Sequence, residues 1–389
     1  MKKKDQWIAT ALVAAATIVT MPGFAAAKSI KVGPSETLTT IQAGVDAASN
    51  GDTVLVLPGT YHEVAVTGAA VTVNKAIRMK GKSKPDAPVI LEGVPGQSDG
   101  ILVEPVNDTD PMVDGFRIQG FTIQGFHNNG IHLRYCSNFQ IQKNTVANNE
   151  ENGIFPTLSA TGTVKRNTSY GSKDSGLWVE ASTDVRVLQN DIHDNPTGLE
   201  VTVSGSVDME KNEIHDNTTG VGLYHPNASG LGNQPFAYGP WTLQNNHIHD
   251  NNTANSAMGG MAAGLPPGGG VLILGVDDVL ITKNDIENNN FYGVSVIDWC
   301  TATDGADYDC NHAMPSYDPY PDRDNTEFNT ILGNGTMPDM SNPLSAYAAD
   351  FTYILVDSTG THHTNRFCGN DYGTYKHPDM TPGATLQCG

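Results

Sequence analysis

Asn129-Gly130-Ile131-His132-Leu133-Arg134 is the first regular copy of a pattern that recurs through the middle of this 389-residue chain. Later copies begin at Asn152, Ser175, Thr197 and Thr219. The second residue of each copy is a glycine, and these glycines lie 23, 23, 22 and 22 residues apart. A column of asparagines keeps nearly the same step, and its members are Asn144, Asn167, Asn190 and Asn212. A fixed period of this length indicates a solenoid, in which each repeat packs on its neighbours.

The content of each repeat favours strands over helices. Apolar and polar residues alternate with a period of two, as around Leu199, Val201 and Val203, and Gly or Asn stands at the corners. Each repeat is therefore predicted to be a coil of about three short strands, stacked about 4.8 Å from the next coil. In these features the chain resembles the right-handed parallel β-helix proteins of the pectate-lyase-like superfamily. We expect an all-β fold, a single-stranded right-handed parallel β-helix with a short N-terminal capping helix.

The N-terminus has the features of a cleavable export signal, predicted over residues 1–27. Three lysines, Lys2 to Lys4, precede an apolar run from Trp7 to Met21, and a small-residue segment ends at Ala27. We therefore expect a secreted or periplasmic protein that is cleaved near Ala27. No other stretch is apolar enough to cross a bilayer, so no integral membrane segment is expected after cleavage.

Residues 28–389 are predicted to form one β-helix domain. An amphipathic helix within Glu36–Ala48 is expected to cover the open end of the solenoid, where strand edges would otherwise be unpaired. The predicted parts are an N-terminal cap at 28–61, coils at 62–297 with insertions at 225–240 and 254–269, an acidic loop at 298–325, and the last coils with a C-terminal cap at 326–389. Long insertions on a rigid scaffold are where binding usually resides.

Acidic residues dominate the charge, with 42 Asp and Glu against 22 Lys and Arg and a formal net charge of −20. Nucleic acid is therefore not an expected partner, because its binding depends on neutralising phosphates with basic side chains. The five cysteines of an exported chain favour disulfides. We expect Cys300 to pair with Cys310 and Cys368 with Cys388, which leaves Cys136 as a packed, unreactive thiol.

The residues two and four positions after each repeat glycine should point outward, because side chains alternate along a strand. They form a predicted strip of His132, Arg134, Phe155, Thr157, Trp178, Glu180, Glu200, Thr202, Gly222 and Tyr224. An exposed aromatic row beside charged groups is typical of a contact surface, and Phe155, Trp178 and Thr202 are the predicted substrate-binding residues. The superfamily resemblance implies the same, an extended polysaccharide along an outer strip of one sheet. Alternatively, the insertion at 225–240 folds back and buries the strip.

Two kinds of catalysis suit this strip, and the spacing does not select between them. Glu180 and Glu200 lie on neighbouring coils, at roughly 6–8 Å between Cβ atoms, and could supply the acid and base of glycoside hydrolysis. Alternatively, His132 or Tyr224 donates a proton while Arg134 binds a uronate carboxylate, as β-elimination or C5-epimerisation requires. A solvated polar face without catalysis is the third reading.

A second ladder places His193, His215 and His249 on successive coils, each followed by an aspartate. Stacked imidazoles could bind a transition metal ion, the only cofactor that the sequence suggests. The alternative is repeat duplication, with each Asp orienting its His. Asp191-Ile192-His193-Asp194 is similar to the Asp-Pro-His-Asp motif of mannuronan C5-epimerases but lacks the proline, so no catalytic role is transferred to it.

The chain is also similar to copper-processing β-helix accessory proteins and to secreted β-helix repeat proteins. Two functions therefore stay open. The first is an exported polysaccharide-binding protein with lyase, epimerase or hydrolase chemistry. The second is a non-catalytic envelope scaffold or accessory protein that handles a metal. The sequence identifies no protein partner.

Overall fold

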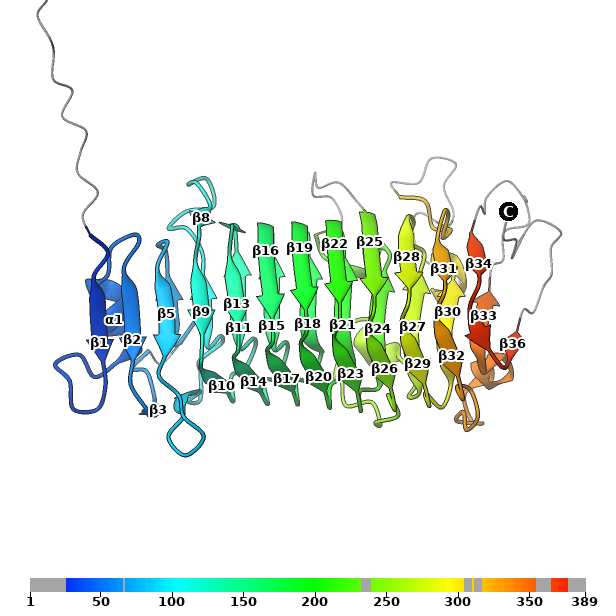
Figure 1. Ribbon diagram of the computed structural model, residues 1–389, viewed down its shortest axis with the longest axis horizontal. Coiled ribbons are helices and arrows are strands. Elements are labelled where there is room, and N and C mark those ends of the chain that lie inside the picture. The colour runs from blue at the N-terminus through cyan, green and yellow to red at the C-terminus, as the bar shows by residue number, and fades with distance from the viewer. Residues whose placement is uncertain are drawn as a thin grey trace, which may run out of the picture.

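The computed structural model describes residues 26–65, 67–231, 239–303, 310, 317–354 and 365–376, and shows three parallel sheets wound into one elongated solenoid (Figure 1). A regular coil contributes one strand to each sheet, and each strand inside a sheet pairs with its counterparts in the coils before and after. The predicted parallel β-helix is confirmed. The export signal at residues 1–27 lies almost wholly outside the described residues.

Sheet A consists of β1 (Ser29–Val32), β2 (Thr53–Val56), β5 (Arg78–Gly81), β9 (Arg117–Gln119), β13 (Gln140–Gln142), β16 (Ala160–Lys165), β19 (Thr183–Leu188), β22 (Gly205–Glu210), β25 (Gly239–Gln244), β28 (Val279–Thr282), β31 (Asn325–Glu327) and β34 (Arg366–Cys368), with the short β8 (Val113–Asp114) and β12 (Cys136–Ser137) beside them. Sheet B consists of β3 (Gly59–Tyr61), β6 (Val89–Glu92), β10 (Thr122–Gln124), β14 (Thr145–Ala147), β17 (Thr168–Tyr170), β20 (Asp191–His193), β23 (Glu213–His215), β26 (His247–His249), β29 (Asp285–Glu287), β32 (Thr330–Leu332) and β35 (Asp371–Tyr372).

Sheet C carries the predicted strip on its outer face. Its strands are β4 (Val71–Val73), β7 (Ile101–Val103), β11 (Ile131–Arg134), β15 (Ile154–Thr157), β18 (Ser175–Glu180), β21 (Thr197–Thr202), β24 (Thr219–Tyr224), β27 (Gly269–Leu274), β30 (Tyr292–Ile297), β33 (Ala349–Ile354) and β36 (Tyr375–Lys376). The helical segments are α1 (Ile41–Ala47), α2 (Trp299–Ala302) and the 3-10 turns Pro226–Ala228, Ala262–Gly264 and Pro343–Tyr347.

The interior of the solenoid is a single apolar core built from columns of like residues. Ile131, Ile154, Leu177, Leu199 and Val221 follow one another in register through sheet C, and all five are fully buried. The period-two alternation directs these side chains inward on every coil, so each new coil buries its apolar residues on those of the previous one. The repeat in the sequence thus becomes a repeat in packing.

Asparagine side chains close the corner between sheets A and B. The side-chain amide of Asn144 donates to Oδ1 of Asn167, and the series continues through Asn190 to Asn212 with N···O distances of 3.0–3.1 Å. These asparagines are buried, and each also donates to a backbone carbonyl, as Asn190 does to Val164. The ladder supplies hydrogen-bond partners to backbone groups that the sharp corner leaves out of the sheets.

The N-terminal end is covered by α1, as predicted, although the helix is shorter than the segment Glu36–Ala48. It begins after Thr40, whose hydroxyl accepts from the amide of Ala43, and the Glu63 carboxylate accepts from the amides of Ile41 and Gln42. Gly44 lies so close to the first coils that a Cβ there would approach Val32 to 2.3 Å. The helix therefore packs its backbone directly on the end of the core.

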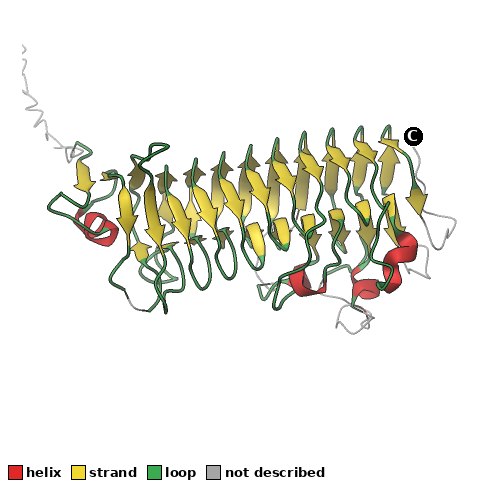
Figure 2. Ribbon diagram, turned by 90° about the horizontal axis from the view of Figure 1, so that it is seen from below, coloured by secondary structure: helices red, strands yellow, loops and turns green. Residues whose placement is uncertain are grey.

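The short helices of the C-terminal half gather along one side of the solenoid (Figure 2). Three of them come from the predicted insertions and acidic loop, whereas Pro343–Tyr347 lies in the segment predicted as last coils and C-terminal cap. On the outer face of sheet C, Tyr224, Leu265, Phe291 and Trp299 belong to one buried apolar cluster. A disulfide joins Cys300 to Cys310, as predicted. Cys368 is also disulfide-bonded, whereas its predicted partner Cys388 lies outside the described residues. Cys136 is a buried free thiol.

Among the described residues, none of the helices has the length and apolar character needed to span a membrane.

Candidate functional site

The outer face of sheet C brings the predicted strip together in two columns. In the first column His132 pairs in register with Phe155, and Trp178 pairs with Glu200. The second column runs through Arg134, Thr157, Glu180, Thr202 and Tyr224. The spacing of the repeat glycines was therefore sufficient to predict which side chains are neighbours.

The expectation that the strip is exposed is wrong for most of it. Phe155, Thr157, Glu180 and Glu200 are at most 9% exposed, and Thr202 and Tyr224 are fully buried, whereas His132, Arg134 and Trp178 are only partly buried. The insertion that begins at His225 folds back onto part of the strip, as the alternative reading held. Its Ser229 hydroxyl donates to Oε1 of Glu180, and its Leu231 packs against the buried apolar cluster of Leu158, Ala181 and Val203.

Tyr224 is consequently unsuited to the predicted role of proton donor to a polysaccharide. Its side chain lies in the apolar cluster under the C-terminal insertions. Burial, with a further contribution from the charge of Glu200, raises the pKa of Tyr224 well above its ordinary value. A phenol without solvent access and with a raised pKa cannot reach a glycosidic bond, so Tyr224 contributes to packing.

The aromatic row is present, but its rings face one another. His132 stacks on Phe155 with ring centroids 4.9 Å apart, and Phe155 stacks on Trp178 at 4.7 Å. The indole N–H of Trp178 donates to the Thr202 hydroxyl at 2.9 Å, so Thr202 holds the indole in place and is itself buried. Since most ring faces cover each other, a sugar would meet the ring edges of this stack.

A group of carboxyls with raised pKa values lies beside the stack. Glu180 accepts from the Thr157 and Ser229 hydroxyls, and Glu200 accepts from the Ser175 hydroxyl at 2.6 Å. Burial raises the pKa of Glu180, and burial together with the charge of Asp174 raises that of Glu200. Register places the two glutamates diagonally on neighbouring strands, as predicted.

Asp174, a further acid of this group whose pKa is raised, was missed by sequence reasoning. Burial, followed by the negative charges of Glu151 and Glu180, raises the pKa of Asp174 to about 6. The side chain is partly exposed at the edge of β18. A signal was available, because the second position before the repeat glycine is acidic in two successive coils, at Glu151 and Asp174.

His132 is held by a second acid that the sequence analysis overlooked. Its Nδ1 lies 3.5 Å from Oδ1 of Asp99, while Nε2 is buried and has no hydrogen-bond partner within the described part of the chain. Burial alone would raise the pKa of Asp99, but hydrogen bonds from His132, Asn129 and Ser98 outweigh it and lower that pKa. Asp99 replaces the asparagine that precedes the repeat glycine in the next two coils, and this departure could have identified it.

Arg134 is less available for a uronate than predicted. Its guanidinium contacts the Glu104 carboxylate at 3.1 Å and the Asp108 carboxylate at 3.6 Å. Two carboxylates therefore already neutralise it, and a substrate carboxylate would have to compete with them.

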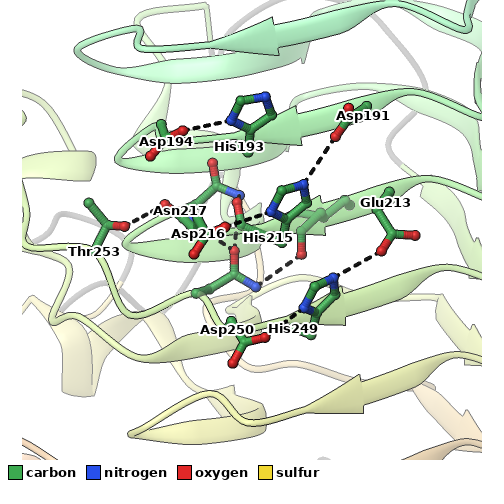
Figure 3. Close-up of polar contacts among 12 residues, drawn as sticks. Asp191, His193, Asp194, Glu213, His215, Asp216, Asn217, His249, Asp250 and Thr253 are labelled. Atoms are coloured by element: carbon green, nitrogen blue, oxygen red, sulfur yellow. Dashed lines mark hydrogen bonds and ion pairs between the residues drawn. The ribbon is translucent and has the colours of Figure 1, made fainter.

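The predicted histidine ladder forms on the outer face of sheet B, away from this site (Figure 3). His193 stacks on His215 with centroids 5.1 Å apart, and His215 stacks on His249 at 5.2 Å. Each ring directs Nδ1 to the aspartate that follows it, at 2.6–2.8 Å. The stack and the His–Asp pairs are confirmed, but the nitrogens of the three rings do not converge on one centre.

Three parallel sheets, one continuous core and a capped end define the class: the protein is a right-handed parallel β-helix protein. A family model described as "Right handed beta helix region" matches residues 99–234. No curated protein sequence matches the chain significantly.

Three solved structures are similar in fold. The A-module of the Azotobacter vinelandii mannuronan C-5 epimerase AlgE4 has a TM-score of 0.60 at 19% identity, over 85% of this chain and 90% of that chain. The Agl-KA catalytic domain has a TM-score of 0.56 at 12% identity, over 85% of this chain and 61% of that domain. An alginate lyase from Paenibacillus sp. str. FPU-7 has a TM-score of 0.51 at 12% identity, over 78% of this chain and 94% of that chain. At these identities the likeness establishes the fold alone.

Proposed function

We propose that the protein is a polysaccharide-acting enzyme that hydrolyses glycosidic bonds on the outer face of sheet C, between Asp99 and Glu200. The observation that carries the proposal is the group of three carboxyls, Asp174, Glu180 and Glu200, beside the stack of His132, Phe155 and Trp178. In this group, burial and the neighbouring charges raise the pKa of Asp174 to about 6. A carboxyl with such a pKa retains a proton near neutral pH and can transfer it to a leaving oxygen. The epimerase and lyase among the fold neighbours support a polysaccharide as the substrate class.

The two steps of hydrolysis can be assigned to named carboxyls. Asp174 donates its proton to the glycosidic oxygen as the bond to the anomeric carbon breaks. Glu180, whose two oxygens accept from the Ser229 and Thr157 hydroxyls, is the partner carboxylate that takes a proton from the attacking water, which requires Ser229 of the covering insertion to release Oε1. The ring edges of His132, Phe155 and Trp178 lie alongside and would position neighbouring sugars.

A second candidate rests on His132. Because Asp99 faces Nδ1, the unpartnered Nε2 is the nitrogen free to accept a proton, as β-elimination or epimerisation of a uronate requires. The surrounding carboxylates disfavour an anionic sugar, and Arg134 is already paired. This reading therefore ranks below hydrolysis of a neutral glycan.

We also propose that the protein is exported. The lysines and the apolar run before Ala27, together with the Cys300–Cys310 disulfide, support an oxidising compartment outside the cytoplasm.

The deciding experiment incubates the protein with a panel of neutral and uronate-containing polysaccharides. Hydrolysis releases reducing ends without absorbance from unsaturated uronates, and Asp174→Asn should lower this rate by about 100-fold or more. Asp208→Asn, which removes an acid from the outer face of sheet A, is the matched control and should leave the rate unchanged. Unsaturated products would favour β-elimination by His132. If neither product forms, a change in uronate stereochemistry seen by proton NMR would favour epimerisation by His132, and no change would favour a non-catalytic binding or scaffold protein.

A further inference from the structure

Glu213, His247 and His249 form a compact group on the outer face of sheet B, remote from the carboxyls of sheet C. Glu213 opens β23, and His247 and His249 are the first and third residues of β26, the next strand of the sheet. Alternation along β26 directs both imidazoles outward, and register places Glu213 directly beside His247. The fold thus brings two nitrogen ligands and one carboxylate onto a single surface.

The three side chains converge on one point. His247 Nδ1 lies 2.8 Å from Glu213 Oε1, and His249 Nε2 lies 2.9 Å from the same oxygen. One ligand atom from each residue lies within 4.8 Å of the others, and no second group of this kind occurs among the described residues. Two histidines and one carboxylate are a donor set typical of first-row divalent transition ions.

The opposite nitrogen of each imidazole has a carboxylate partner of its own. His247 Nε2 lies 3.1 Å from Glu287 Oε1, and His249 Nδ1 lies 2.8 Å from Asp250 Oδ2; Figure 3 shows Asp250, His249 and Glu213 in line. In metal sites such outer carboxylates orient the imidazole and make its other nitrogen a better ligand. The arrangement therefore supplies both a set of ligands and the groups that hold them.

We propose that Glu213, His247 and His249 form a binding site for a divalent transition ion such as Zn²⁺. Ligand bonds of about 2.0–2.1 Å place tetrahedral ligand atoms about 3.3 Å apart, so the 2.8 and 2.9 Å contacts need to open by only a few tenths of an ångström. The ion takes the place of the protons that these nitrogens share with Glu213. The side chains of Glu213 and His247 are 48% and 37% exposed, which leaves an open side for water and for entry.

This site differs from the ladder that the sequence predicted. His215 directs its two nitrogens to Asp216 and Asp191, and His193 directs Nδ1 to Asp194, so neither ring shares a carboxylate oxygen with a second histidine. The predicted set of His193, His215 and His249 is therefore replaced by one in which only His249 is retained. The local cause is His247, which stands where the two preceding coils carry Asp191 and Glu213.

The test is equilibrium dialysis of the protein, prepared without a polyhistidine tag, against Zn²⁺ alone. The wild type should retain one zinc per chain, and His247→Ala and His249→Ala should each lose at least about 10-fold in affinity. Glu213→Gln should weaken binding in the same direction. His127→Ala, which removes an exposed histidine paired with Glu150, is the matched control and should retain the zinc.

Three outcomes would overturn the proposal. The first is a wild type that takes up no stoichiometric zinc. The second is a loss of zinc affinity in His127→Ala equal to that in His247→Ala, which would mean that scattered surface histidines bind the ion. The third is an equal loss of zinc affinity in His193→Ala, which would assign binding to the whole ladder. Circular dichroism and the melting temperature of each variant show whether a loss of zinc reflects unfolding. The four substituted histidines, His127, His193, His247 and His249, all retain solvent exposure.

Discussion

At the scale of single residues, Asp174 shows how electrostatics and position combine. The carboxyl is partly buried and faces the charges of Glu151 and Glu180, so its ionised form is disfavoured. A folded-state pKa above that of the unfolded chain means that this acid destabilises the fold progressively as pH rises from about 4 through 6. The residue proposed as proton donor is therefore a source of strain at neutral pH.

Asp174→Asn should raise the free energy of unfolding at pH 8 by up to about 3 kcal/mol, because the amide carries no charge to bury. The gain should shrink as pH is lowered toward 4, where the carboxyl is protonated in the folded protein. Urea unfolding of the wild type and Asp174→Asn at pH 8 and pH 4.5 measures the change in the free energy of unfolding, and Asp208→Asn is the control. An equal effect at the two pH values would contradict the proposed electrostatics.

Glu151 provides a second test at the same scale, because its charge helps to raise the pKa of Asp174. The proposed hydrolysis needs protonated Asp174, so its rate should fall as pH rises through about 6. Glu151→Gln should move that fall to lower pH while leaving the maximal rate within about threefold, since this variant retains the acid itself. A pH–rate profile that does not move would exclude Asp174 as the group that titrates.

At the scale of elements, the corner between sheets A and B depends on the asparagine ladder. Asn190 is buried, donates to Asn212 and to the carbonyl of Val164, and accepts from Asn167. Asn190→Ala leaves these buried partners without a hydrogen bond and should cost about 2–4 kcal/mol in the free energy of unfolding.

The matched variant is Asn370→Ala, in the last coil of the same ladder. Asn370 accepts from Asn329 but is only partly buried, so water can replace the lost contacts. Asn370→Ala should lower the free energy of unfolding, measured with urea, clearly less than Asn190→Ala does. Similar losses would mean that burial along the ladder is not what makes its amides important.

At the scale of the whole molecule, the strands of each coil pair only with strands of the coils on either side, so the stability of the regular solenoid is approximately a sum of interactions between neighbouring coils. The two ends differ from the middle because an end coil has one neighbour, and α1 takes the place of the missing one at the N-terminus (Figure 1). A substitution that displaces α1 should therefore destabilise only the first coils.

Gly44→Val should test this locality, because its side chain would collide with Val32 and Val54 and lift α1 from the first coil. Hydrogen exchange should become faster in β1, β2 and β5 and stay unchanged in β18 and β21. Faster exchange along the whole chain would show that the solenoid opens as one cooperative unit.

The sequence by itself determined the parallel β-helix, the neighbours on each face and the histidine stack. These follow from a repeat of 22–23 residues and from the alternation of apolar and polar residues with a period of two. Together the two periods assign the strand residues of the regular coils to a coil and to a face. His132 beside Phe155 and Trp178 beside Glu200 could therefore be predicted without coordinates.

Only the tertiary structure decided which of those residues solvent can reach and which atoms converge. Tyr224 is buried in the apolar cluster to which the insertions contribute, Ser229 of one insertion covers Glu180, and the path of an insertion does not follow the repeat. Likewise, Glu213 meets His247 and His249 at one oxygen through side-chain rotation, which spacing does not specify. The physical reason is that periodicity sets backbone position, whereas exposure and ligand geometry depend on contacts between segments that share no period.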